Sequence, residues 1–271
     1  MDAKMTPTPF KDPLFIDLLR KAAHELRFLL KRGYPMTSCI RFIGNHHQLP
    51  TAGRQALLRS HSRYVTSKDR IKKCVSPDKL QGARVAIDGY NVILTVETAL
   101  MGKPLFMSSD RTIRDIRTVG GNYKYTSISQ KGVELIFEAL KSARVAEVNW
   151  VFDKPVSGSG EMARLIRNWE PERDQKPGMS DKGNGAETSP TTHEMTILIT
   201  AETASSADRK LANISNNDPK TLIASSDAPL LDRVHRWFNL AELTILPLIQ
   251  CGKTYRKKAV MYYPINLVSP I

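Results

Sequence analysis

The sequence has few cysteines and no long apolar run. Its 271 residues include three cysteines, Cys39, Cys74 and Cys251, which never form a Cys-x-x-Cys pair. An odd number of widely spaced cysteines argues against a disulfide framework and against a zinc ribbon, so we interpret them as reduced thiols. No segment approaches the length of a membrane span, and residues 1–4 do not begin the apolar core of a signal peptide. We therefore expect a soluble, cytoplasmic protein.

Acidic residues are scarce in the first part of the chain. Residues 1–80 contain 16 Lys or Arg and 6 Asp or Glu, whereas residues 81–271 contain 24 and 21, so 10 of the 13 net positive charges lie in the first third. A cationic region beside a nearly neutral one favours a polyanionic partner. Nucleic acid is favoured over membrane, because no basic helix carries an aromatic-rich face. A merely soluble cationic surface is the simpler alternative.

Three helices are expected in the basic part of the chain. Asp12-Pro13 is a typical helix start, and apolar residues follow at helical spacing. Further helices are predicted at residues 35–44 and from residue 51 onward. Three small helices permit a helix-turn-helix module, in which Arg54 and Arg59 would contact nucleic acid, although any small helical bundle has the same pattern.

His46 and His47 are adjacent in a predicted turn. Neighbouring histidines point in different directions, and no nearby cysteine or second histidine pair completes a tetrahedral metal site. We therefore interpret both as turn or surface residues.

From residue 84 onward, short apolar runs alternate with helical segments, which is typical of a parallel α/β sheet. Strands are predicted at residues 84–87, 105–107, 147–152, 195–199, 221–224 and 243–246. Residues 170–193 are polar and rich in Gly and Pro, so they are interpreted as a flexible insertion. The predicted organisation is a basic helical domain at residues 1–62, a basic linker at 63–82, an α/β domain at 83–250 and a C-terminal tail at 251–271.

Acidic residues recur where predicted strands end. Asp88, Asp153 and Asp227 each follow an apolar run, and Asp208 opens a predicted helix. A single such Asp is equally well a helix cap, but four together predict a shared acidic pocket at the carboxyl ends of the strands. Clustered carboxylates repel one another, and oxygen-only ligands select hard ions such as Mg²⁺ or Mn²⁺. Such ions activate water and stabilise the leaving oxygen of a phosphodiester.

The same positions carry a resemblance to a known family. Residues 87–93 (Ile-Asp-Gly-Tyr-Asn-Val-Ile), 151–153 (Val-Phe-Asp), 206–208 (Ser-Ala-Asp) and 224–227 (Ala-Ser-Ser-Asp) resemble the successive motifs of PIN-like nuclease domains of the NYN type. The resemblance covers residues 84–247, and the whole chain is similar to a largely uncharacterised prokaryotic family with many archaeal members.

This resemblance implies a PIN-like α/β/α sandwich behind a small all-α domain, with Mg²⁺- or Mn²⁺-dependent ribonuclease activity on RNA more than on DNA. It also implies that Asn91 orients a ligand or the substrate phosphate. The metal-binding and catalytic acids that it implies are Asp88, Asp153, Asp208 and Asp227.

Three further residues bear on that site. The acid that many PIN domains carry on an early helix has only Glu97 as a candidate here. Lys154 follows Asp153 directly and would place a cation in or beside the pocket, where it replaces an ion or binds phosphate. Asp232 is a candidate fifth acid, although one helical turn beyond Asp227 it is equally placed to pair with Arg233 or Arg236.

Residues 108–127 combine cations with aromatic residues. Arg111, Arg114, Arg117 and Lys124 are interleaved with Tyr123 and Tyr125. Aromatic rings stack on bases while cations contact phosphates, which suits single-stranded nucleic acid; an ordinary surface loop is at least as good an interpretation. A Gly/Ser turn at residues 157–160 precedes a predicted helix and suits a phosphate, but it lacks the Lys-Ser/Thr ending of a P-loop.

The leading hypothesis is therefore a Mg²⁺- or Mn²⁺-dependent endoribonuclease. The alternative is a non-catalytic RNA- or DNA-binding adaptor in which the acidic residues are structural. A small-molecule phosphatase on the same scaffold is a weaker third hypothesis, because it would need no basic N-terminal domain.

Overall fold

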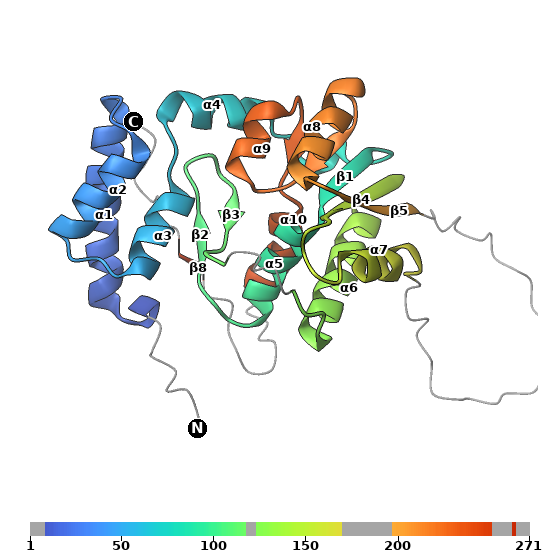
Figure 1. Ribbon diagram of the computed structural model, residues 1–271, viewed down its shortest axis with the longest axis horizontal. Coiled ribbons are helices and arrows are strands. Elements are labelled where there is room, and N and C mark those ends of the chain that lie inside the picture. Colours follow the sequence, from blue (N-terminus) through green and yellow to red (C-terminus); the bar gives the residue numbers. More distant parts are fainter. Residues whose placement is uncertain (1–8, 118–122, 170–196, 251–261, 264–271) are drawn as a thin grey trace, which may run out of the picture.

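The computed structural model describes residues 9–117, 123–169, 197–250 and 262–263 (Figure 1). Within them, an all-helical N-terminal region is followed by an α/β region with a parallel sheet, which confirms the predicted fold class. The predicted insertion at 170–193 lies outside the described residues, as does the predicted tail at 251–271 apart from residues 262–263. No helix in the described part of the chain is long and apolar enough to cross a membrane.

The N-terminal region contains the three predicted helices. They are α1 (Pro13–Lys31), α2 (Met36–His46) and α3 (Thr51–Ser60), and a short 3₁₀ helix (Pro9–Lys11) precedes them. The Asp12 carboxylate accepts a hydrogen bond from the Leu14 backbone N–H at 2.9 Å, so the predicted cap is confirmed. Their apolar faces form one buried cluster. A fourth helix, α4 (Tyr64–Lys73), lies in the segment that was predicted as a linker, and a second 3₁₀ helix (Pro77–Lys79) follows it.

The main sheet has five parallel strands in the order β5-β4-β1-β6-β7. Their bounds are β1 Arg84–Asp88, β4 Glu147–Asp153, β5 Leu198–Ala204, β6 Leu222–Ala224 and β7 Trp237–Phe238. The strand β1 therefore lies at the centre, and its carboxyl end has strand ends on both sides. In such sheets, ligands bind in the crevice beyond the carboxyl ends of the strands.

Helices cover both faces of this sheet (Figure 1). One face packs against α5 (Gly89–Leu100), α6 (Ser127–Ser142), α7 (Ser159–Arg167) and α10 (Leu240–Gln250), and the other against α8 (Ala207–Asn217) and α9 (Ala228–Arg233). Successive residues of β1 alternate between the two cores, as a period of two requires, since Val85 and Ile87 face the first and Ala86 the second. Both faces of a parallel sheet are thus buried.

The strand predicted at residues 243–246 is wrong. These residues lie within helix α10, and the fifth strand is the shorter β7 before it. An apolar run of this length does not by itself distinguish a buried strand from a buried helix. The sequence signal for this helix start is Asn239 followed three residues later by Glu242. In the structure, the Asn239 side chain accepts a hydrogen bond from the Glu242 backbone N–H at 3.1 Å and donates one to the Glu242 carboxylate at 3.0 Å.

A small three-stranded sheet joins the two regions. It consists of β2 (Leu105–Met107), β3 (Ile113–Arg114) and β8 (Tyr262–Tyr263). Phe106 of β2 is fully buried and belongs to the apolar core of the helical region. Ser108, Asp110 and residues 112–114 are buried as well, so the first part of the predicted loop 108–127 is packed inside the protein rather than spread over its surface.

Gly89 is required where β1 turns into α5. A Cβ atom at this position would overlap the ring of Phe152, which comes from the neighbouring strand β4. We expect Gly89→Ala to lower the free energy of unfolding by about 1–3 kcal/mol, the usual cost of overpacking a buried site. Denaturant unfolding of the variant beside Gly160→Ala, where a Cβ meets open space, checks this. Equal stability of the two variants would contradict the steric argument.

Candidate acidic site at the carboxyl edge of the sheet

Asp88 ends the central strand and is only 6% exposed. It occupies the N-cap position of α5, yet its side chain makes no capping hydrogen bond, so the simple capping role considered above is not what the structure contains. Its carboxylate instead accepts a hydrogen bond from the Ser225 hydroxyl at 2.8 Å. Ser225 follows β6, so this bond joins the carboxyl ends of two adjacent strands.

Asn91 holds the loop that carries Asp227. Its side-chain oxygen accepts hydrogen bonds from the Ser226 backbone N–H at 2.8 Å and from the Ser226 hydroxyl at 3.0 Å. Asp227 in turn accepts a bond from the Leu230 backbone N–H at 3.2 Å and caps α9. The motif at residues 87–93 therefore positions the motif at residues 224–227.

Asp153 and Asp208 belong to the other side of the central strand. Asp153 ends β4 and accepts a hydrogen bond from the Ala207 backbone N–H, the first residue of α8, at 2.8 Å. Asp208 is the next residue, in the first turn of α8. Helices α5, α8 and α9 all begin at this edge, and their positive N-terminal ends partly offset the negative charge that gathers there.

The four aspartates lie close enough to influence one another electrostatically. Burial raises the pKa of Asp88 to about 8; the Ser225 hydrogen bond opposes this rise, and the charges of Asp208, Asp227 and Asp153 add to it. Burial, followed by the charges of Asp227 and Asp153, also raises the pKa of Asp208. None of the four carboxylates has an ion-pair partner within 4.0 Å in the described residues. In the described residues the cluster thus has no direct ion pair, although the charge of Arg233 opposes the rise in the pKa of Asp208.

The raised pKa of Asp88 makes stability depend on pH. Asp88 has a pKa of about 8 in the folded protein against an ordinary value of 3.8, so between these limits the folded chain holds a proton that the unfolded chain has released. In metal-free buffer, each pH unit in this window should lower the free energy of unfolding by up to about 1.4 kcal/mol. Asp88→Asn removes this titration. Urea unfolding from about pH 5 to 7 should therefore give a steeper decline for the wild type, and parallel profiles would contradict this.

The donor set of the site suits a hard divalent cation. The four aspartates offer carboxylate oxygens, and a bound cation would offset the mutual repulsion that adds to the raised pKa values of Asp88 and Asp208. In the part of the chain that the structure describes, the four aspartates do not bring three ligand atoms within 4.8 Å of one another. Mg²⁺ keeps several water ligands and is commonly held by one or two carboxylates, so a Mg²⁺ site does not need three carboxylates in direct contact with the ion.

The other acids predicted near the site are engaged elsewhere. The Asp232 carboxylate accepts two hydrogen bonds from the Arg70 guanidinium, at 2.6 and 2.8 Å, and not from Arg233 or Arg236. Glu97 is buried and accepts from Arg117 at 3.0 Å and from the Tyr123 hydroxyl at 2.6 Å. Lys154 is exposed directly after Asp153.

Several cations predicted to bind nucleic acid make internal contacts. Arg54 donates to Asn45 at 3.0 Å and to the Leu49 carbonyl at 2.9 Å, which braces the turn between α2 and α3. Arg59 donates to the carbonyl of Arg117 at 3.3 Å. Of the remaining predicted cations, Arg114 is buried, Arg117 is paired with Glu97, and Arg111 and Lys124 are exposed.

Sequence reasoning missed the buried ion network that contains Arg114. Asp110 is fully buried and accepts hydrogen bonds from Arg70 at 2.9 Å and from Arg114 at 2.7 Å. Arg114 also donates to the Ser226 carbonyl at 2.6 Å, immediately before Asp227. The spacing of Asp110 and Arg114, four residues apart with opposite charges, was a local signal, but nothing in the sequence marked Arg70 as their partner.

A groove of about 460 Å³ brings two predicted binding features together. It is lined by Tyr123, Lys124 and Tyr125 and by Ser157 and Gly158, which belong to the Gly/Ser turn before α7. The remaining lining residues are Glu161, Met162 and Leu165.

Tyr90 links this groove to the acidic site. Its ring lies 5.0 Å from that of Tyr123. Burial, together with the negative charge of Asp153, raises the pKa of Tyr90 to about 12.

Comparison with known proteins gives a relative but no function. The chain is 30% identical over 152 residues to "Uncharacterized protein MJ0935" of Methanocaldococcus jannaschii, and the match covers 55% of this chain and 71% of the relative. A family model described as "Protein of unknown function (DUF434)" matches residues 18–78, and "Domain of unknown function (DUF5616)" matches residues 77–177. The second range contains Asp88 and Asp153 and ends before Asp208. No solved structure matches the chain at a significant level.

Proposed function

We propose that this protein, which belongs to the same two-part family as the uncharacterized archaeal protein MJ0935, is a divalent-metal-dependent ribonuclease. One observation carries the proposal: four aspartates from different elements gather at the carboxyl edge of the sheet without an ion-pair partner in the described residues. Burying unpaired charge is costly, and such a cluster is retained where a cation binds. The order of the four motifs, which resembles that of NYN-type PIN-like nucleases, supports the same function.

The four aspartates of the cluster would have different roles in binding the ion. Asp88 and Asp227 would bind the principal Mg²⁺ or Mn²⁺ ion, with Asp153 and Asp208 completing the site. A cation bound there activates water and stabilises the leaving oxygen of a phosphodiester. The neighbouring side chains fix the ligands, since Ser225 donates to Asp88 and Asn91 holds the loop of Asp227. Asp153, Asp208 and Asp227 are only partly buried, so a phosphate can reach them from solvent.

The groove beside the site supports a single-stranded substrate. Tyr125 is 39% exposed, which leaves its ring available to a base, and Lys124 beside it is exposed and suits a phosphate. The turn at Ser157 and Gly158 adds backbone N–H groups at the start of α7. A net charge of +13 favours approach of a polyanion.

The test is cleavage of labelled single-stranded and structured RNAs by the full-length protein in Mg²⁺, Mn²⁺ or EDTA. Cleavage that requires a divalent ion and ceases in Asp88→Asn supports the nuclease. RNA binding that weakens with salt, without cleavage in either metal, would replace this proposal with the non-catalytic adaptor.

A further inference from the structure

A second group of potential metal ligands lies in the helical region, where α1 packs against α2. Glu25 extends from α1, His46 is the last residue of α2, and His47 follows it as the C-cap. One ligand atom from each lies within 4.8 Å of the other two. This is the set of three His, Cys, Asp or Glu that meets this spacing in the described residues. None of the three belongs to the acidic site.

The fold creates this arrangement from residues that are distant in sequence. Gly33, with φ of 86°, allows the chain to reverse between α1 and α2. At the end of α2, the His47 backbone N–H donates to the Ile43 carbonyl at 3.0 Å, and the chain then turns through Gln48, with φ of 50°. The His47 ring is thereby turned back onto α1, where its Nε2 atom lies 2.8 Å from the Glu25 carboxylate.

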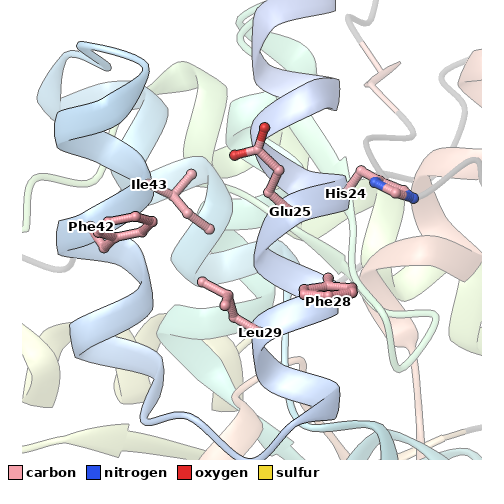
Figure 2. Close-up of a pocket in the computed structure, with 6 residues that line it drawn as sticks. All are labelled: His24, Glu25, Phe28, Leu29, Phe42 and Ile43. Carbon is pink, nitrogen blue, oxygen red and sulfur yellow. The ribbon is translucent and has the colours of Figure 1, made fainter.

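Figure 2 shows the groove between the two helices. Glu25 and Leu29 extend from α1 toward α2, and Ile43 extends from α2 toward α1. His24 also lines the groove, but its ring points away from α2 although it is adjacent to Glu25 in sequence. His24 is therefore not part of the cluster, because its side chain points away from Glu25 and α2.

The structure brings a third side chain to the two histidines that the sequence left without a nearby ligand. Their rings do differ in direction, with an interplanar angle of 78°, but the centroids lie only 4.7 Å apart and both rings reach the same place. The third member of the cluster, Glu25, was not apparent from the sequence because it lies 22 residues before His47. The side chain of His47 is 12% exposed and that of Glu25 is 45% exposed, whereas His46 lies on the surface. The cluster is thus anchored on one side and open to solvent on the other.

We propose that Glu25, His46 and His47 bind a Zn²⁺ ion. Two imidazole nitrogens and one carboxylate oxygen are ligands that Zn²⁺ accepts, and three protein ligands leave a fourth position for water. Zn–N and Zn–O bonds of about 2.1 Å place tetrahedral ligand atoms about 3.4 Å apart. The Glu25–His47 pair therefore has to open by only about half an ångström as the ion replaces the shared proton. The bound ion joins α1 to the end of α2.

Direct Zn²⁺ titration of the full-length, metal-free protein tests the proposal, with a chromophoric chelator as competitor. With excess Mg²⁺ added to occupy the acidic site, we expect one Zn²⁺ site. His46→Ala and Glu25→Gln should each weaken Zn²⁺ binding there by at least about tenfold, the loss that removal of an outer-sphere partner already causes. Co²⁺ absorption should report a four-coordinate ion in the wild type and not in these variants. His46 is exposed, so His46→Ala should remain folded.

Two control variants separate this site from others. His24→Ala removes a neighbouring histidine that faces away from α2, and Asp218→Asn removes an acid that lies outside both candidate sites and pairs with Arg84; both should keep the wild-type Zn²⁺ affinity. In the same excess of Mg²⁺, Zn²⁺ should raise the melting temperature of the wild type and of both controls, because it binds the folded state, and should leave that of His46→Ala unchanged. Wild-type affinity in His46→Ala and Glu25→Gln, or loss of binding in either control, would overturn the proposal, as would an absence of Zn²⁺ binding.

Discussion

Replacing Asp88 by Asn is expected to abolish metal-dependent RNA cleavage while the protein stays folded. Asn has nearly the same shape as Asp and can still accept the hydrogen bond from Ser225, but it cannot supply the charged oxygen that would hold a cation at the most buried position of the cluster. If a bound cation supplies several kcal/mol of transition-state stabilisation, its loss lowers the cleavage rate by roughly a hundredfold or more. Single-turnover cleavage with saturating protein measures this directly, and RNA affinity should change little.

The matched control is Asp218→Asn. This change has the same chemistry in the same domain, but Asp218 pairs with Arg84 at 3.0 Å, at the amino end of β1 and thus on the opposite edge of the sheet. Its cleavage rate should stay within a few fold of the wild type. Undiminished cleavage by Asp88→Asn, or equal losses in both variants, would remove Asp88 from the centre of the site.

The grouping of the aspartates was predictable because it follows from strand geometry alone. Carboxyl ends of parallel strands meet at one edge, so an Asp after each of three apolar runs had to lie near the others once the sheet was parallel. Asp88 and Asp227 follow the adjacent strands β1 and β6, and Asp153 follows β4 on the other side of β1. The start of α1 was equally accessible, since Asp12 and Pro13 act within one turn of helix.

Partners that are distant in sequence were beyond the reach of the same reasoning. Arg114 looked like a surface cation because it lies in a segment rich in Ser, Arg and Gly, yet tertiary packing buries it against Asp110 and the distant Ser226 carbonyl. Asp232 was equally well placed to pair with Arg233, but Arg70, 162 residues earlier, takes its carboxylate. A local charge pattern shows which residues are charged, but it does not show which partners they contact in the folded protein.

The buried network of Asp110 connects the helical region to the acidic site. Arg70 of α4 contacts both Asp110 and Asp232 of α9, while Arg114 contacts Asp110, the Arg59 carbonyl at the end of α3 and the Ser226 carbonyl. Burial alone would raise the pKa of Asp110, but the charge of Arg114, with hydrogen bonds from Thr112, Arg114 and Arg70, lowers it to about 2. Asp110 is therefore ionised, and its stability contribution, present above about pH 4, is lost only as pH falls toward 2.

Arg114→Met should consequently lower the free energy of unfolding by about 3–5 kcal/mol, because it leaves Asp110 buried with one cation instead of two. Urea denaturation at pH 7 measures the loss. Arg111→Met is the matched control: Arg111 is exposed three residues earlier, and its removal should change stability by less than about 0.5 kcal/mol. Adding Asp110→Asn to Arg114→Met should recover part of the loss, since the two residues are in direct contact and their effects are not additive. If the double variant is destabilised by the full sum of the single losses, Arg114 acts by filling space, and the charge of Asp110 does not explain its burial.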